Sequence, residues 1–236
     1  MRSPSFLILS VALGLSLCIL PQETRGQVDQ KFTFEHLPSG SHLRNIKPWY
    51  LDRGEDDAYS GFTVGEAPDG NGALALTQPS RVGRLGLSLR PIVATEGDLN
   101  AIALTFLVST KAEAPLLLSF SADRGRTHIV SLRVMPDGEM LFSTERSSRS
   151  PAILPFLWVP GSWNKLVLAV FPEAGQIRIR LLNENDEIQG EQLAPLIREA
   201  SDETLPWWSI HLSLGTPTNV PWYIRSVAFE AAQLNE

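Results

Sequence analysis

The sequence contains 236 residues, of which 43% are apolar and 19% are charged, and its formal net charge is −6. This composition excludes an intrinsically disordered chain and a coiled coil. The negative charge would repel DNA and other polyanions, so we expect no nucleic-acid partner. No internal repeat or low-complexity linker divides the chain, which favours a single domain.

The N-terminal residues have the pattern of an export signal. Arg2 provides a positive charge, an apolar run extends from Phe6 to Leu20, and Pro21 ends it. The run has about 15 residues, whereas a membrane-spanning helix needs about 20. We therefore predict a cleaved signal peptide at 1–26 and one mature domain at 27–236. The mature domain would be secreted or periplasmic, with no membrane insertion after cleavage.

The single cysteine supports export without disulfide bonds. Cys18 lies inside the predicted signal, so the mature domain has no cysteine at all. An alternative interpretation is a lipoprotein signal, because Leu15–Cys18 resembles a lipobox. Leu17, however, stands where a lipobox normally has Gly or Ala, and the segment lies within the apolar run.

Alternating apolar and polar residues, separated by turn residues, predict many antiparallel strands. In chain order, the predicted strands are Lys31–Glu35, Ser60–Val64, Leu74–Leu76, Leu85–Leu89, Ala101–Thr110, Leu116–Phe120, Val130–Val134, Met140–Thr144, Leu166–Val170, Ile177–Leu181, Trp208–Leu214 and Trp222–Glu230.

The clearest hairpin joins Leu166–Val170 to Ile177–Leu181 through the turn Pro172–Gly175. Ile177 and Ile179 alternate with arginines, which predicts an apolar inner face and a polar outer face.

One segment has helical spacing instead, and it predicts a short helix at Ala194–Ala200. The fold class is therefore all-β: a two-sheet antiparallel jelly-roll sandwich with one short helix.

Three stretches resemble the concanavalin A-like jelly-roll domains of the laminin-G type, as found in secreted bacterial proteins. Phe32–Glu35 resembles their opening strand, and Trp222–Glu230 resembles the closing strand that pairs near it. Gly161–Leu168 followed by Gly175–Ile179 resembles their signature hairpin. A galactose-binding-type jelly roll is the nearest alternative. The resemblance implies two stacked antiparallel sheets and a role in carbohydrate binding.

The same resemblance suggests a polysaccharide-acting enzyme, either a glycoside hydrolase or a lyase, as the alternative function. Retaining glycosidases need two carboxyl groups about 5–5.5 Å apart, which a strand provides through alternate residues. The nearest match, Glu184–Glu187, lacks the alternation and is polar throughout, as a hairpin loop is. The sequence also has no Gly-x-Ser-x-Gly motif. We therefore assign no catalytic residue.

Acidic residues crowd one predicted loop, at Asp52 and Glu55–Asp57 beside Gly54. The resemblance implies a possible structural calcium ion, which prefers several oxygen ligands from a flexible loop. The alternative is a solvated acidic turn. We assign no metal ligand and no other cofactor.

Aromatic residues are the remaining candidates for ligand binding. Trp207, Ser209 and His211 alternate along one predicted strand, opposite an apolar face, and form the predicted ligand-binding site. Arg178 and Arg180 would line the same outer surface. The predicted function is non-catalytic recognition of a polysaccharide or cell-envelope glycan by an exported β-sandwich. Packing of Trp207 against the sheet, in a purely structural surface protein, is the alternative.

Overall fold

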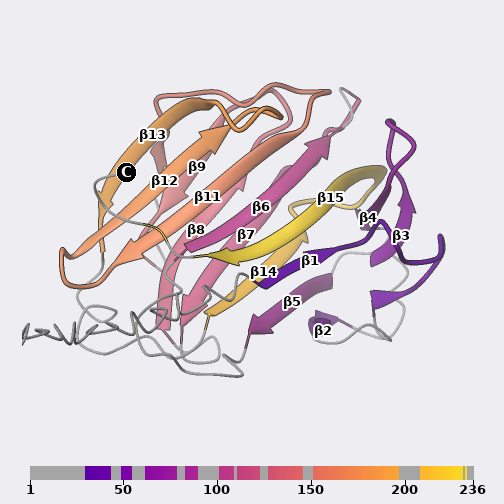
Figure 1. The fold of residues 1–236 in the computed structure, drawn as a ribbon, viewed down its shortest axis with the longest axis horizontal. Coiled ribbons are helices and arrows are strands. Elements are labelled where there is room, and N and C mark those ends of the chain that lie inside the picture. Colours follow the sequence, from indigo (N-terminus) through magenta and orange to yellow (C-terminus); the bar gives the residue numbers. More distant parts are fainter. Residues whose placement is uncertain are drawn as a thin grey trace, which may run out of the picture.

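The computed structural model of the chain shows two β-sheets stacked face to face (Figure 1). It describes residues 30–43, 49–54, 62–78, 83–89, 101–108, 111–122, 127–145, 151–196, 208–230 and 232. The two predicted segments 1–26 and 197–200 lie outside these residues. No helix in the described ranges is long and apolar enough to cross a membrane.

The first sheet has eight strands. They are β1 (Gln30–Thr33), β3 (Phe62–Glu66), β4 (Gly72–Gln78), β6 (Ala101–Val108), β11 (Asn164–Phe171), β12 (Gln176–Leu182), β13 (Ile188–Pro195) and β15 (Thr218–Glu230). The order across the sheet is β13-β12-β11-β6-β15-β4-β3, with β1 paired to β15.

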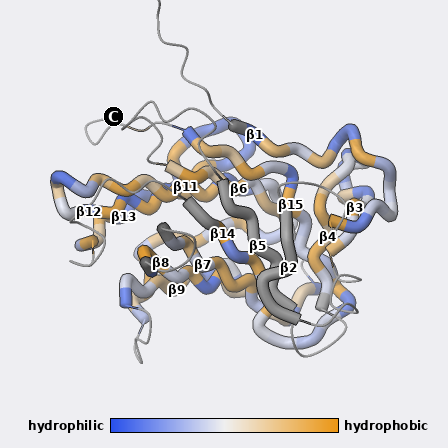
Figure 2. The backbone as a smooth tube through the Cα atoms, turned by 90° about the horizontal axis from the view of Figure 1, so that it is seen from below, coloured by the Kyte–Doolittle hydropathy of each residue, from blue (hydrophilic) through white to orange (hydrophobic). Residues whose placement is uncertain are grey.

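The second sheet has seven strands. They are β2 (Trp49–Gly54), β5 (Gly83–Leu89), β7 (Leu116–Ala122), β8 (Thr127–Val134), β9 (Met140–Ser143), β10 (Ala152–Ile153) and β14 (Trp208–Leu214). The order is β10-β9-β8-β7-β14-β5-β2, and all the pairings are antiparallel. Figure 2 shows the two sheets as separate layers.

The opening and closing strands of the domain are neighbours, as the resemblance implies. β1 pairs antiparallel with β15, and Phe32 lies opposite Val227. The ring of Phe32 also meets the ring of Phe229 edge to face, with centroids 6.4 Å apart. The pairing ties the two ends of the described chain together in one sheet, which limits fraying at the termini.

The core lies between the sheets and follows from the alternation seen in the sequence. Along β12, Ile177, Ile179 and Leu181 are fully buried, as the hairpin pattern predicts. Three aromatic rings meet at the centre: Trp158 and Trp222 have ring centroids 5.5 Å apart, and each also contacts Phe106. Burial of such side chains supplies the main stabilisation of a two-layer fold.

The predicted short helix is wrong where the structure describes it. Ala194 and Pro195 belong to β13, and the N–H of Leu196 donates to the carbonyl of Gly175 over 2.9 Å. The backbone pairing with β12 outweighs the local helical spacing, because Ala194 packs opposite Ile177 in the core-facing register. The Glu184–Glu187 stretch lies in the turn between β12 and β13, as expected of a hairpin loop.

Candidate functional site

Two of the predicted ligand-binding positions, Ser209 and His211, lie on β14, an interior strand of the seven-stranded sheet. Ile210 and Leu212 of this strand are fully buried in the core. Ser209 and His211 occupy the alternate positions, so they share the outer face of the sheet. Trp207 lies outside the described residues, and its role as a ligand platform stays a prediction.

The register places a row of small polar residues across this outer face. His211 lies opposite Ser119 on β7, Ser119 lies opposite Ser131 on β8, and Ser131 lies opposite Ser143 on β9. On the other side, His211 lies opposite Gly86 of β5. The row therefore continues through five neighbouring strands with hydroxyl and imidazole groups at four of its positions.

A second row runs beside the first. Ser209 lies opposite Ser88 on β5 and opposite Ser121 on β7, and Ser121 lies opposite His128 on β8. We call the two rows together the serine–histidine face, and its positions are Ser88, Ser119, Ser121, His128, Ser131, Ser143, Ser209 and His211, with Ser88 and Ser209 placed by strand register alone. Serine hydroxyls both donate and accept hydrogen bonds, so the face offers groups of both kinds to a polar ligand.

The centre of the serine–histidine face is the most enclosed part of it. His211 is 6% exposed and Ser121 is 4% exposed, whereas Ser119 and Ser131 are half-buried. The hydroxyl oxygen of Ser121 is buried and has no hydrogen-bond partner within the described chain. A buried hydroxyl of this kind is costly unless a water molecule or a ligand satisfies it.

The structure corrects the expected position of the two arginines. Arg178 and Arg180 lie on β12 of the eight-stranded sheet, so they cannot line the same surface as His211 on β14. Arg178 is 3% exposed, with its guanidinium carbon 5.3 Å from the ring centroid of Phe171. Arg180 donates to Glu191 over 2.6 Å. Residues on the outer face of a sheet are thus not all exposed to solvent, and the alternation of apolar and polar residues in the sequence does not show which of them are buried.

The outer face of the eight-stranded sheet carries a different kind of polar site, which we call the Asp69 cluster: Asp69, Trp163 and Arg225. The indole N–H of Trp163 donates to the Asp69 carboxylate over 2.9 Å, and Arg225 forms an ion pair with the same oxygen. The Arg225 guanidinium also lies 3.9 Å from the Trp163 ring centroid. Each member therefore interacts with both of the others.

The backbone places Arg225 in this cluster through an irregularity in β15. The register of β15 against β6 shifts between Ile224 and Ser226, so Arg225 is the extra residue of a β-bulge. Bulges redirect a side chain away from the regular alternation. Ile224 and Val227 remain buried on either side.

The Asp69 carboxylate remains ionised to a lower pH than usual. Its partial burial raises its pKa, but hydrogen bonds from Asn71 and Trp163, together with the charge of Arg225, outweigh this effect. The net result is a pKa below the ordinary value of 3.8. The carboxylate is therefore a fixed partner in the cluster at neutral pH.

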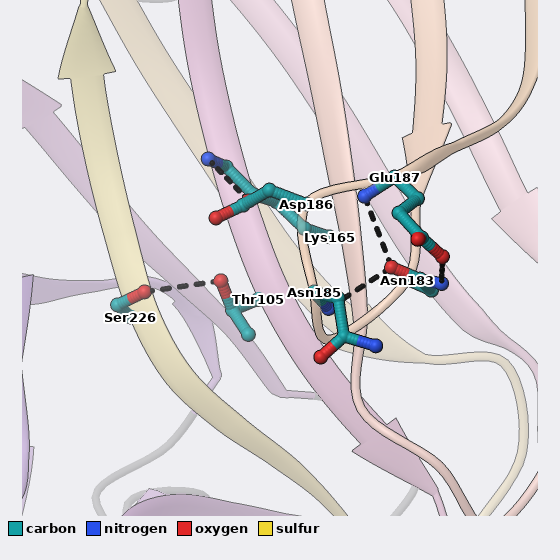
Figure 3. A network of polar contacts seen from close by, with 7 residues as sticks. All are labelled: Thr105, Lys165, Asn183, Asn185, Asp186, Glu187 and Ser226. Atoms are coloured by element: carbon teal, nitrogen blue, oxygen red, sulfur yellow. Dashed lines mark hydrogen bonds and ion pairs between the residues drawn. The ribbon is translucent and has the colours of Figure 1, made fainter.

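Other polar groups of the eight-stranded sheet also pair with one another (Figure 3). Ser226 bonds to Thr105 over 3.2 Å, and Lys165 donates to Asp186 over 3.1 Å. In the adjoining turn, the side-chain oxygen of Asn183 accepts the N–H groups of Asn185 and Glu187. Such internal pairing stabilises the face and leaves fewer groups for an external ligand.

Carboxylates are scarce on the seven-stranded sheet. Its strands, as bounded above, contain one acidic residue, Asp52 in β2. The predicted acidic loop is therefore partly a strand, and Glu55–Asp57 lie outside the described residues. Within the described ranges, no cluster of three or more His, Cys, Asp or Glu side chains could hold a metal ion.

Solved structures with the same arrangement of sheets include several plant lectins. Lectin II from Ulex europaeus is 13% identical with a TM-score of 0.52, and the match covers 86% of this chain and 99% of that one. Peanut lectin is 14% identical with a TM-score of 0.51, covering 86% and 97% of the two chains. Winged bean acidic lectin, complexed with methyl-α-D-galactose, is 12% identical with a TM-score of 0.51, covering 87% and 100%.

A sialidase has the same fold over a small part of its length. The match is 10% identical with a TM-score of 0.50, and it covers 86% of this chain but 18% of the sialidase. No family model matches the sequence, and no curated protein matches it. At these identities the similarity shows the fold alone: a concanavalin A-like jelly-roll sandwich, which confirms the predicted two-sheet antiparallel architecture.

Sequence reasoning found two members of the serine–histidine face and missed the others. Ser131 alternates with apolar residues and gives the signal of an ordinary outer position, whereas Ser119 and Ser143 each follow three consecutive apolar residues and give no alternation signal. Only the strand order brings them into a row with His211, and that order depends on pairings between strands distant in the sequence.

Proposed function

We propose that this protein recognises a glycan through the serine–histidine face of its seven-stranded sheet, without catalysing a reaction. The observation that carries the proposal is the continuous row from His211 through Ser119 and Ser131 to Ser143. Sugars are recognised through many hydroxyl groups, each of which needs a donor and an acceptor nearby.

The fold supports carbohydrate as the ligand class, since lectins share it. Trp207 directly precedes β14 in the sequence and would add an aromatic ring against which a sugar could stack. The alternative of a glycosidase needs two carboxylates. The strands of this sheet supply Asp52, so a hydrolase would have to take its second carboxylate from a connecting loop.

The proposal includes export and a laminin-G type of sandwich. The signal-like residues 1–26 support export to the periplasm or the exterior, where envelope polysaccharides are accessible. The three sequence stretches at Phe32–Glu35, Gly161–Ile179 and Trp222–Glu230 support the laminin-G type. A structural calcium ion remains part of the proposal because the acidic residues Glu55–Asp57 follow directly on β2.

A glycan array probed with the mature domain, residues 27–236, tests the proposal with and without a chelator. We expect binding to a limited set of glycans. A Ser131→Trp variant places a bulky ring in the middle of the row and should abolish this binding. The matched control is Thr63→Trp, a hydroxyl residue of similar exposure on β3 of the opposite sheet, which should bind like the wild type.

Circular dichroism must show that both variants are folded. A folded wild-type domain that binds no glycan would contradict the proposed function. Equal binding by the wild type and Ser131→Trp, with loss in Thr63→Trp, would place the ligand on the eight-stranded sheet instead. Loss of signal in the chelator arm alone, restored by added calcium, would show that a calcium ion supports glycan binding.

A further inference from the structure

Large apolar side chains are exposed on one side of the sandwich. In the described part of the chain, five such side chains have exposed fractions between 45% and 62%: Ile153, Leu157, Val159, Ile188 and Leu193. Ile153 is in β10, and Leu157 and Val159 are in the segment that follows this strand. Ile188 and Leu193 are in β13. β10 and β13 are edge strands of their respective sheets.

The two edges meet along a connecting segment. Exposed and buried side chains alternate strictly over residues 153–159. The buried ones are Leu154, Phe156 and Trp158. Phe156 packs directly against Gly190 of β13, where any side chain larger than hydrogen would collide with its ring. Leu157 and Ile188 lie one and two residues along the chain from this contact, so the segment and β13 adjoin, and we call their exposed apolar residues together the apolar edge.

The apolar edge carries almost no charge. Residues 151–163 contain no charged side chain. Glu191, the charged residue of β13, is paired with Arg180 over 2.6 Å. The chain as a whole has a net charge of −6, so two copies would repel each other over most of their surface. Acidic residues flank the apolar edge, with Asp137 in the turn beside Leu157 and Glu187 next to Ile188. The five exposed side chains of the edge are themselves uncharged, and apolar surface is complementary to itself.

The area of the surface also suits a second copy. Five half-exposed side chains contribute more than half of the ~800 Å² that each partner buries in a standard protein interface. The flanking exposed residues Pro151, Ala152, Pro155 and Gln189 supply further area. Patches of this kind on soluble proteins generally mark an interaction site.

We propose that the apolar edge is the contact surface of a homodimer, formed by a second copy of this chain related by two-fold symmetry. Such an interface uses the same patch on both copies, so residues from β13 and from the 153–159 segment of each copy are buried together. Leu157, the most exposed of the five, would lie near its centre. The serine–histidine faces of both copies remain on the outer surfaces of their sheets.

Sedimentation velocity of the mature domain over a wide concentration range tests the proposal. We expect a reversible dimer. Leu157→Asp buries a carboxylate in the interface and should weaken dimerisation by at least about tenfold, as should Ile188→Asp on the other element. The control, Asn219→Asp, adds the same charge at an exposed position of β15 and should leave the dimer intact.

Circular dichroism and thermal melts establish whether the variants are folded. If Leu157→Asp is not folded, Leu157→Ser is used in its place. A wild-type domain that remains monomeric at near-millimolar concentration overturns the proposal. So does a dimer that survives both Leu157→Asp and Ile188→Asp. A monomer that binds uncharged lipid vesicles through Leu157 would identify a lipid surface, not a second copy, as the occupant.

Discussion

The two outer faces of this sandwich use polar residues in opposite ways. On the eight-stranded sheet, Asp69, Trp163 and Arg225 interact with one another, although the Nε atom of Arg225 is buried without a hydrogen-bond partner in the described chain. On the seven-stranded sheet, the row through His211, Ser119 and Ser131 consists of short side chains in register, and the buried hydroxyl of Ser121 lacks a partner in the described chain. The first face therefore contributes mainly to stability, and the second is the one that we propose as the binding surface.

The largest expected loss of folding stability comes from a substitution in the Asp69 cluster. Trp163→Ala removes a buried ring that also holds Asp69 and Arg225, and we expect it to destabilise the protein by about 3 kcal/mol. Chemical denaturation measures this loss. Glycan binding per folded molecule should be unchanged, and a binding defect in folded Trp163→Ala would contradict the separation of roles.

Arg225→Ala should have a smaller effect on stability, about 1 kcal/mol, because Trp163 still donates to Asp69 after the change. Arg225→Lys is the informative control, since it keeps the positive charge but loses the flat guanidinium that stacks on the indole ring. Denaturation midpoints of the two variants should both fall below the wild type. If the denaturation midpoint of Arg225→Lys equals that of the wild type, the positive charge alone accounts for the contribution of Arg225 to the Asp69 cluster.

The Asp69 cluster also predicts a pH dependence. The pKa of Asp69 is lower in the folded chain than its ordinary value of 3.8, so the folded state favours the ionised carboxylate. Its stabilising contribution is therefore complete above the ordinary value and is lost as the pH falls through the lowered pKa. Melting temperatures of the wild type and Asp69→Asn should converge as the pH is lowered into this range. A constant difference between them would contradict the assignment.

The smallest changes in folding stability are expected for substitutions on the serine–histidine face. Ser121→Ala removes a buried hydroxyl without a described partner, so we expect stability to be unchanged or higher by up to about 1 kcal/mol. Ser119→Ala should change stability by less than about 0.5 kcal/mol. Ser119→Ala should weaken glycan binding, as measured by isothermal titration calorimetry, whereas Ser121→Ala should bind like the wild type because its hydroxyl is shielded from the surface. Full affinity of Ser119→Ala would show that its hydroxyl does not contact the ligand.

The fold was largely predictable because most strands alternate cleanly. Ile177 and Ile179 on β12, and Ile210 and Leu212 on β14, face the core as their spacing requires. β13 was not predictable in this way, because it is an edge strand whose residues Gln189, Glu191 and Gln192 are polar or half-exposed. Its pairing with β12 is set by the neighbouring strand, and the local sequence favours a helix near Ala194 instead.

The candidate site was less predictable than the fold. Alternation placed Ser209 and His211 on an outer face, but it could not show which strands lie beside β14. Arg178 illustrates the same limit, since it has the pattern of an outer residue and is nevertheless buried beside Phe171. Strand order and the covering of a face arise from contacts between distant segments, which a single strand pattern does not contain.

Mapping the bound glycan by nuclear magnetic resonance tests the central claim most directly. The mature domain, labelled with ¹⁵N, would be titrated with a glycan selected on the array, and the backbone amide shifts would be assigned. We predict that the largest shifts occur at Ser119, Ser131 and His211, with little change at Thr105 and Arg225. Shifts concentrated at Thr105 and Arg225, with none along the serine–histidine face, would contradict the account.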